Sequence, residues 1–443
     1  MNVSFTQLVL ALAAGVGFII LLTAKYHVHA FFALVLACFI TGLGIQMPFP
    51  LILTTIKEGF GNIMKSLGFI IVLGTTLGVL LEHTGSTKVM AYYILKKIGE
   101  RNAALAVSIT GFIVGLPVFC DSGFIVLSGL NKSLSKKTGI PLVTMSVSLA
   151  TGLYAVHCLL PPHPGASAAA GIIGVDFGKL MLSGIVIAIP AMIAGHLWAV
   201  YAGKKNENSF HAQEAEQETT NSLPSVLNAF LPVVIPIFLI ALRSIILLRL
   251  PNPTGWGSGL LAVGDPLVAL SVGVMFALVN VSFWKRKTIN LFFQEAVEKA
   301  GSILVIIGAG GAFGSVLAAA GIGNYFSDAG YLKGLGILFP FLITSLLKTA
   351  QGSSTVAIIT AAPIVLPLLP SLGLDSENGK LLAVLSMGAG SMMISHANDA
   401  YFWVITKFTG LEINTTLKVY SVASILMGLV TLAMVFVLSI ILS

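Results

Sequence analysis

Four short polar interruptions in otherwise apolar sequence hold the residue types best suited to binding a ligand. They are Phe119–Gly123 (FCDSG), His157–Gly165 (HCLLPPHPG), Gln351–Thr355 (QGSST) and Ser395–Asp399 (SHAND). Inside a bilayer, polar backbone that is not helical persists only where protein or a water-filled cavity satisfies it. Transporters place substrate and ion sites at such interruptions. The pattern therefore predicts one ligand site built from all four segments.

The first and third interruptions are interpreted as tips of helical hairpins. Each second arm would begin just after the turn, so its free N–H groups and positive dipole end face the tip and favour a carboxylate. Neighbouring hydroxyl groups add hydrogen-bond donors. We therefore predict that a small organic anion is bound by Ser122, Gly123, Gln351, Gly352, Ser353, Ser354 and Thr355. The alternative is that these residues merely cap helices.

Asp121 stands beside the predicted anion site, where a charged carboxylate would repel the ligand. Burial among apolar neighbours disfavours the charged form, so a proton could accompany the substrate. The hypothesis is that Asp121 is the proton-coupling carboxylate, alone or together with Asp399, and His157 is a further candidate. Alternatively, Asp121 is an N-cap for the following arm and His157 is a packed histidine bonded to a carbonyl.

The second and fourth interruptions are interpreted as breaks in membrane spans. Three prolines, at 161, 162 and 164, must end the helix and free carbonyl groups. His163 lies inside this break, and His396 and Asn398 lie inside the other, so all three are predicted to contact substrate. An asparagine amide can both donate to and accept from a polyhydroxyl compound.

Lys348 lies three residues before the Gln351 tip, which places a cation deep in the membrane. Such a charge is costly unless it is paired. Lys348 could meet Asp121 or Asp399, or it could hold the substrate carboxylate directly. The remaining alternative is a lysine that extends its charge toward the interface.

The composition requires a membrane as solvent. Of 443 residues, 56% are hydrophobic and only 9% are charged, against about 25% charged in soluble domains. Apolar stretches long enough to cross a bilayer recur along the chain. The first of them has no preceding Lys or Arg, so it is interpreted as a retained span and not a signal peptide. The chain is therefore predicted to be an all-α polytopic membrane protein.

Other function classes lack their signatures. The net charge of +7 comes from short basic clusters between apolar runs, which is not the pattern of a nucleic-acid-binding face. Three separated cysteines form no disulfide framework or metal motif. No phosphate-binding loop, H-E-x-x-H or G-x-S-x-G motif occurs. We expect no cofactor, no metal, no ATP-driven pumping and no enzyme activity, with a proton as the coupling ion.

A weak internal repeat divides the chain. Leu67–Met90 resembles Ile303–Phe326, with Gly74 and Gly78 in register with Gly310 and Gly314 at an offset of 236 residues. Their small-xxx-small spacing predicts close helix packing. The polar segment between the halves reads as a linker. The predicted units are residues 1–203 with a hairpin at about 103–131, a cytoplasmic linker at 204–227, and residues 228–443 with a hairpin at about 335–370.

The basic residues predict how the halves are oriented. Each half offers five crossings, at 8–24, 30–46, 67–82, 140–173 and 180–202, and at 228–248, 264–284, 302–320, 381–409 and 418–442. With the N-terminus outside, most Lys and Arg residues fall on the linker side, which marks the cytoplasm. Because five is odd, the second half runs opposite to the first. The predicted fold is two inverted-topology repeats of five transmembrane helices, each with one re-entrant hairpin and one broken helix.

Three motifs carry a resemblance to a known family. HCLLPPHPGASAAAG at residues 157–171, AQGSSTVA at 350–357 and SHANDAYFW at 395–403 resemble the gluconate permease family, and the similarity extends over nearly the whole chain. The chain departs from the gluconate-type pattern at CDSGF, where Glu-Val-Gly is more usual, and at Lys348. Both departures lie in the predicted site.

The resemblance implies proton symport of gluconate or a related sugar acid across a bacterial inner membrane, with both termini in the periplasm by the topology above. It also implies membership of a wider ion transporter superfamily and a homodimer with a scaffold domain and a moving transport domain. Because one relative within the family carries D-serine, the same fold could instead carry D-serine, glycerate or a dicarboxylate.

Overall fold

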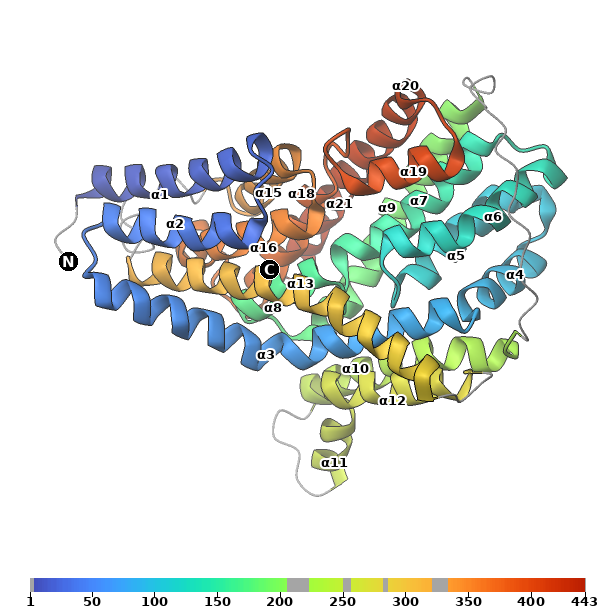
Figure 1. Ribbon diagram of the computed structural model, residues 1–443, viewed down its shortest axis with the longest axis horizontal. Coiled ribbons are helices and arrows are strands. Elements are labelled where there is room, and N and C mark those ends of the chain that lie inside the picture. Colours follow the sequence, from blue (N-terminus) through green and yellow to red (C-terminus); the bar gives the residue numbers. More distant parts are fainter. Residues whose placement is uncertain (1–3, 205–222, 250–255, 282–285, 321–333, 443) are drawn as a thin grey trace.

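Two long helices, α3 (Phe49–His83) and α13 (Arg286–Ala319), lie side by side and run in opposite directions (Figure 1). Gly59 in α3 faces Ser315, whereas Glu82 near its other end faces Lys299. At 35 and 34 residues each exceeds the thickness of a bilayer core. The predicted spans 67–82 and 302–320 were therefore too short, because the charged residues before them are part of the same helices.

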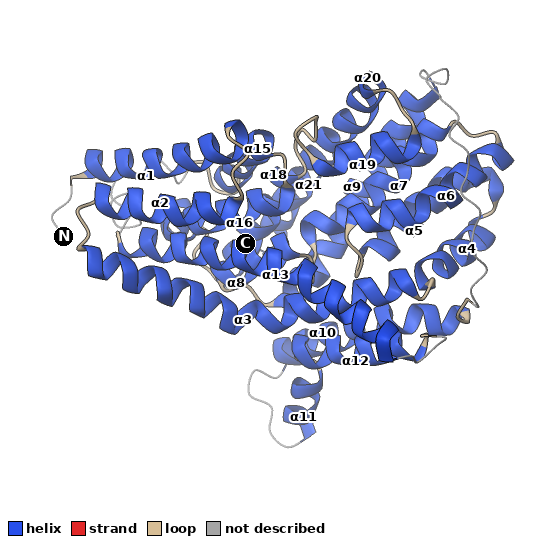
Figure 2. Ribbon diagram, in the orientation of Figure 1, coloured by secondary structure: helices blue, strands red, loops and turns tan. Residues whose placement is uncertain are grey.

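The computed structural model describes residues 4–204, 223–249, 256–281, 286–320 and 334–442. Within these ranges the regular elements are helices, without a strand (Figure 2). Eight helical segments are long and apolar enough to span a membrane, at residues 6–23, 49–83, 142–173, 177–204, 226–247, 287–319, 354–372 and 413–442. The prediction of an all-α polytopic membrane protein is confirmed.

The first half contains two short apolar helices before α3 and six helices after it. Their bounds are α1 (Phe5–Ile20), α2 (Ala30–Gly44), α4 (Ser86–Ile98), α5 (Ala103–Gly115), α6 (Cys120–Thr138), α7 (Leu142–Leu159), α8 (Pro164–Ile173) and α9 (Phe177–Lys204). Every residue of α7 is buried. The first broken span therefore lies in the interior of the protein, away from lipid.

The second half contains α13 and, among the described residues, ten further α-helices. Its helices are α10 (Val226–Arg249), α11 (Trp256–Val263), α12 (Pro266–Val279), α15 (Leu338–Gln351), α16 (Ser354–Val365), α17 (Leu369–Leu372), α18 (Glu377–Ser391), α19 (Ala400–Thr409), α20 (Ile413–Thr416) and α21 (Val422–Leu442). The helix ends at 83 and 319, and the helix starts at 164 and 400, are each 236 residues apart. Most of the predicted linker, residues 205–222, lies outside the described residues.

The four glycines singled out in the sequence lie at tight contacts. A Cβ atom at Gly74 would come within 2.8 Å of Pro162, and one at Gly78 within 2.8 Å of the Pro117 carbonyl oxygen. In the other half, a Cβ at Gly310 or Gly314 would meet α16 at 2.7 or 2.8 Å. These glycines let α3 and α13 approach the segments that carry the polar interruptions.

Both pairs of interruptions have the predicted local form. α5 and α6 are joined by a turn at residues 116–119, and α15 and α16 by Gly352 and Ser353. α7 and α8 are separated at residues 160–163, and α18 and α19 at 392–399. Helices of opposite halves interleave here, since Gly165 of α8 packs against α16 and Gly388 of α18 against α7.

Candidate functional site

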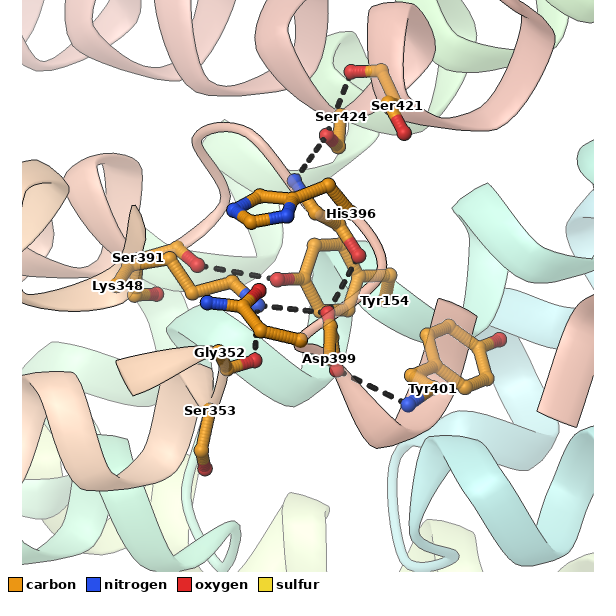
Figure 3. A network of polar contacts seen from close by, with 12 residues as sticks. Tyr154, Lys348, Gly352, Ser353, Ser391, His396, Asp399, Tyr401, Ser421 and Ser424 are labelled. Atoms are coloured by element: carbon orange, nitrogen blue, oxygen red, sulfur yellow. Dashed lines mark hydrogen bonds and ion pairs between the residues drawn. The ribbon is translucent and has the colours of Figure 1, made fainter. Parts of the chain in front are cut away.

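A buried ion pair between Lys348 and Asp399 lies at the centre of the site (Figure 3). The Lys348 Nζ atom is 2.6 Å from Asp399 Oδ2 and 2.6 Å from the Gly352 carbonyl oxygen. The lysine is fully buried and the aspartate is 5% exposed. Lys348 therefore does not reach the membrane interface, and the interpretation of it as a snorkelling lysine is wrong.

Asp399 is held by further donors around this pair. The hydroxyl of Ser395 donates to Asp399 Oδ2, and the Tyr401 amide donates to Oδ1 at 2.9 Å, which makes Asp399 the N-cap of α19. A buried charge pair is tolerated only when its remaining lone pairs are satisfied. The break before α19 therefore supplies the counter-ion of Lys348 and the hydrogen-bond donors that hold that counter-ion in place.

The second hairpin tip lies directly against the second break. Gly352 adopts a left-handed conformation with φ of +81°, and a Cβ there would clash with the Asn398 backbone. The Asn398 amide donates to the carbonyl of Thr349 at 2.8 Å, and His396 Nε2 lies 3.2 Å from the same oxygen. His396 and Asn398, predicted to bind substrate, thus contact the last carbonyl groups of α15 in this structure.

The second tip also presents polar groups without partners. Both side-chain amide atoms of Gln351 are buried and have no hydrogen-bond partner among the described residues, and the same holds for Nδ1 of His157. The other ring nitrogen of His157 lies 3.4 Å from the Thr355 hydroxyl. Buried polar atoms normally have partners, so these atoms are suited to hydrogen-bonding a ligand.

Ser353 and Ser354 open the second arm of this hairpin. The Ser353 hydroxyl accepts from the Val356 amide at 3.3 Å as the N-cap of α16. Ser354 is buried in the first turn. The capping role proposed as an alternative for the tip residues therefore holds for Ser353, while the first-turn N–H groups of α16 still form a positive helix end.

The first hairpin tip carries a carboxylate in place of a cation. Asp121, Ser122 and Gly123 lie in the first turn of α6, and Phe119 occupies the N-cap position. The interpretation of Asp121 as an N-cap is therefore wrong. The Cys120 thiol donates a weak hydrogen bond to Asp121 Oδ1 at 3.9 Å. The Asp121 carboxylate also interacts electrostatically with Asp399 and Lys348. This carboxylate is held less firmly than Asp399.

The two histidines join the first tip to the first break. His163 Nε2 lies 2.6 Å from the Gly115 carbonyl oxygen at the end of α5. The ring centroids of His157 and His163 are 4.9 Å apart, and the Phe119 ring lies 6.4 and 6.1 Å from them. Because His157 also reaches Thr355, this cluster connects the sites of both halves.

The sequence patterns did not identify two tyrosines whose hydroxyl groups form hydrogen bonds with the opposite half of the chain. The Tyr154 hydroxyl of α7 donates to the Ser391 carbonyl at 3.0 Å, and the Tyr401 hydroxyl of α19 donates to the Ala150 carbonyl at 3.2 Å. Their rings stack at 5.7 Å. Neither tyrosine lies in a Gly- or Pro-rich interruption, and only the fold brings them together beside Asp399.

Comparison with known proteins assigns nearly the whole chain to one family. The model of the GntP family permeases matches residues 7–441. The chain belongs to this family. It is 32% identical over 442 residues to a gluconate permease of Pseudomonas aeruginosa, covering 98% of this chain and 97% of the relative. It is also 32% identical to the Gnt-II system L-idonate transporter of Escherichia coli, covering 95% and 96%.

Two solved transporter structures share the fold of this chain. This permease superposes on the YdaH transporter of Alcanivorax borkumensis with a TM-score of 0.64 at 16% identity, covering 88% of both chains. The score for MtrF of Neisseria gonorrhoeae is 0.60 at 16% identity, covering 87% and 83%. The family match and the named relatives, together with the eight apolar spans among the described residues, show that the permease is an integral, multi-pass membrane protein of a transporter family and not of an enzyme family, as the sequence predicted.

Proposed function

We propose that this permease takes up gluconate or a closely related sugar acid together with a proton. The observation that carries the proposal is the buried Lys348 and Asp399 pair beside a helix N-terminus and the unpartnered Gln351 amide. A cation and a positive helix end suit a carboxylate, and free amide and imidazole atoms suit hydroxyl groups. The names of the relatives, gluconate permease and L-idonate transporter, support the same substrate class.

The ion pair suggests how a proton and an anion are linked. While Asp399 is ionised, its carboxylate is the counter-ion of Lys348. When a proton neutralises Asp399, the lysine loses its counter-charge and the substrate carboxylate can replace it. Asp121, within range of both charges, either delivers this proton or shares it. A proton and a substrate anion thus enter together without net charge, and Lys348 has a counter-charge both before and after the substrate binds.

Topology and assembly belong to the same proposal. The five-helix halves are inverted repeats, 204–227 is a cytoplasmic linker, both termini lie in the periplasm and the protein is a homodimer in a bacterial inner membrane. The opposite directions of α3 and α13 support the inversion. The hairpins then enter from opposite faces, so their tips meet near the middle of the bilayer.

Uptake into proteoliposomes tests the function. Purified protein would be reconstituted and supplied with labelled gluconate, L-idonate, glycerate, D-serine or a dicarboxylate, with and without an inward proton gradient. Gluconate or a related sugar acid should accumulate only with the gradient. Accumulation independent of the gradient contradicts proton coupling, and transport of D-serine, glycerate or a dicarboxylate in place of any sugar acid contradicts the substrate class.

A further inference from the structure

A cavity of about 450 Å³ lies between α3, α9, α10 and α12. Its volume is within the range that is usual for small-molecule sites, about 300–1,000 Å³. None of the described residues that line it belongs to the four polar interruptions, so it is separate from the site described above. Its charged lining residues come from four different segments and are Lys65, Asp176, Arg243 and Asp265.

These four charged residues lie on one side of the membrane in the predicted topology. Each of them is at or near the outer end of a predicted span. The fold brings the four segments together around one cavity. The cavity therefore lies at the outer boundary of the bilayer, at the level of the lipid head groups.

The charges in the cavity are balanced, but only two of the four are paired with each other. Arg243 Nη1 and Asp265 Oδ2 are 2.5 Å apart and form an ion pair. Asp176 Oδ1 accepts hydrogen bonds from the Ser244 hydroxyl and the Lys179 amide, both at 2.8 Å. Among the described residues, no ion pair involves Lys65 or Asp176. The cavity thus offers one cation and one carboxylate to a ligand, and its net charge is zero.

Apolar side chains border the same cavity. Phe69 and Leu267 line it and are 70% and 39% exposed. An apolar crevice adjoins it and shares the lining residues Ile70, Phe177 and Ile240. A sugar acid has no apolar part that could cover these side chains. A ligand that matches both surfaces has a charged head and a hydrocarbon chain, and in a bilayer phospholipids have this form.

We propose that this cavity binds the head group of a phospholipid that carries a primary ammonium, such as phosphatidylethanolamine. Its phosphate accepts hydrogen bonds from Lys65 and Arg243, its ammonium donates to Asp176, and its acyl chains lie against Phe69 and Leu267. A zwitterionic head group keeps the cavity neutral, whereas an anionic one adds an uncompensated negative charge. A choline head group has no N–H to donate to Asp176.

The position of the cavity connects the lipid to the transport site. The adjoining crevice is also lined by Pro117, in the turn at the first hairpin tip, and by Pro161 and Pro162, in the first break. A lipid bound here lies beside the contact of α10 with these segments. Because a ligand that binds only the folded protein stabilises it, the lipid should raise the unfolding temperature.

The test is lipid binding to the purified, delipidated full-length protein in detergent, measured by native mass spectrometry and thermal unfolding. Phosphatidylethanolamine should bind at least about tenfold more tightly than phosphatidylcholine or phosphatidylglycerol, the equivalent of one charge-assisted hydrogen bond. Lys65→Met should lower the affinity for phosphatidylethanolamine by a similar factor without changing the unfolding temperature in the absence of lipid. Lys57→Met, at an exposed lysine of α3 outside the cavity, is the matched control and should change neither quantity.

Two further variants test each half of the head group. Asp176→Asn keeps an acceptor for Ser244 but loses the charge, so phosphatidylethanolamine should bind no better than phosphatidylcholine. Lys65→Arg keeps a cation for the phosphate and should retain the affinity. Equal affinities for the three lipids, tighter binding of phosphatidylglycerol, or unaltered phosphatidylethanolamine binding in both Lys65→Met and Asp176→Asn would overturn the proposal. None of these outcomes depends on which substrate the permease carries.

Discussion

The two hairpin tips differ in charge and in how tightly that charge is held. At the second tip, Lys348 is locked between Asp399 and the Gly352 carbonyl. At the first tip, Asp121 accepts, among the described residues, only a weak hydrogen bond from the Cys120 thiol at 3.9 Å. In the proposed function, the second tip binds the anion and the first tip handles the proton.

Removing the cation from the second tip should have the largest effect. Lys348→Met leaves Asp399 buried and unpaired, so the free energy of unfolding should fall by about 3–5 kcal/mol and uptake should be lost. Thermal unfolding in detergent and gluconate uptake are the measurements. The double variant with Asp399→Asn should recover stability but not uptake.

An exposed ion pair provides the control for this variant. Lys179 and Glu377 lie 2.6 Å apart, with the glutamate side chain 84% exposed, so Lys179→Met should cost about 1 kcal/mol or less. A comparable loss of stability in both lysine variants would contradict the special status assigned to the buried pair.

Neutralising the first tip should separate proton movement from substrate exchange. Asp121→Asn cannot release a proton, so gradient-driven uptake should fall by roughly tenfold or more, while counterflow persists. Unaltered gradient-driven uptake in this variant would remove Asp121 from the coupling role. Because Asp121 lacks a firm partner, its loss should change the unfolding temperature much less than loss of Lys348.

Changing the free amide at the second tip should alter affinity more than stability. Gln351→Leu removes no internal side-chain hydrogen bond, so the unfolding temperature should stay close to that of the original protein. The KM for gluconate should rise by about 2- to 12-fold, the equivalent of one hydrogen bond. An unchanged KM would mean that Gln351 does not contact the substrate.

The smallest effect on transport is expected from a substitution in α3, the helix that packs against the first tip. Gly78→Ala pushes a methyl group against the Pro117 carbonyl and should cost about 1–3 kcal/mol in stability with little change in KM. Gly68→Ala, in the same helix with open space around it, should be neutral or slightly stabilising. Equal stability of the two variants would contradict the close contact between α3 and the tip.

Much of this site could be found from residue types. Asp121, Lys348 and Asp399 stand out because charge is rare in apolar sequence, and Gly and Pro mark where helices must end. The same reasoning found both hairpins and both breaks. It could not choose between Asp121 and Asp399 as the partner of Lys348, because the bonded pair is separated by 51 residues.

Glu82 shows most clearly what required the tertiary structure. In the sequence it ends an apolar run and resembles an ordinary residue at the membrane boundary. Only the length of α3 and its contact with α13 largely bury it and bring it within 3.8 Å of Lys299.

The amino-acid sequence determined that the chain is helical, lies in a membrane and has paired interruptions, since hydropathy and helix-breaking residues act locally. The pairing of charges was decided by packing between helices distant in sequence. Electrostatic partners depend on distance in space, and no local pattern encodes that distance.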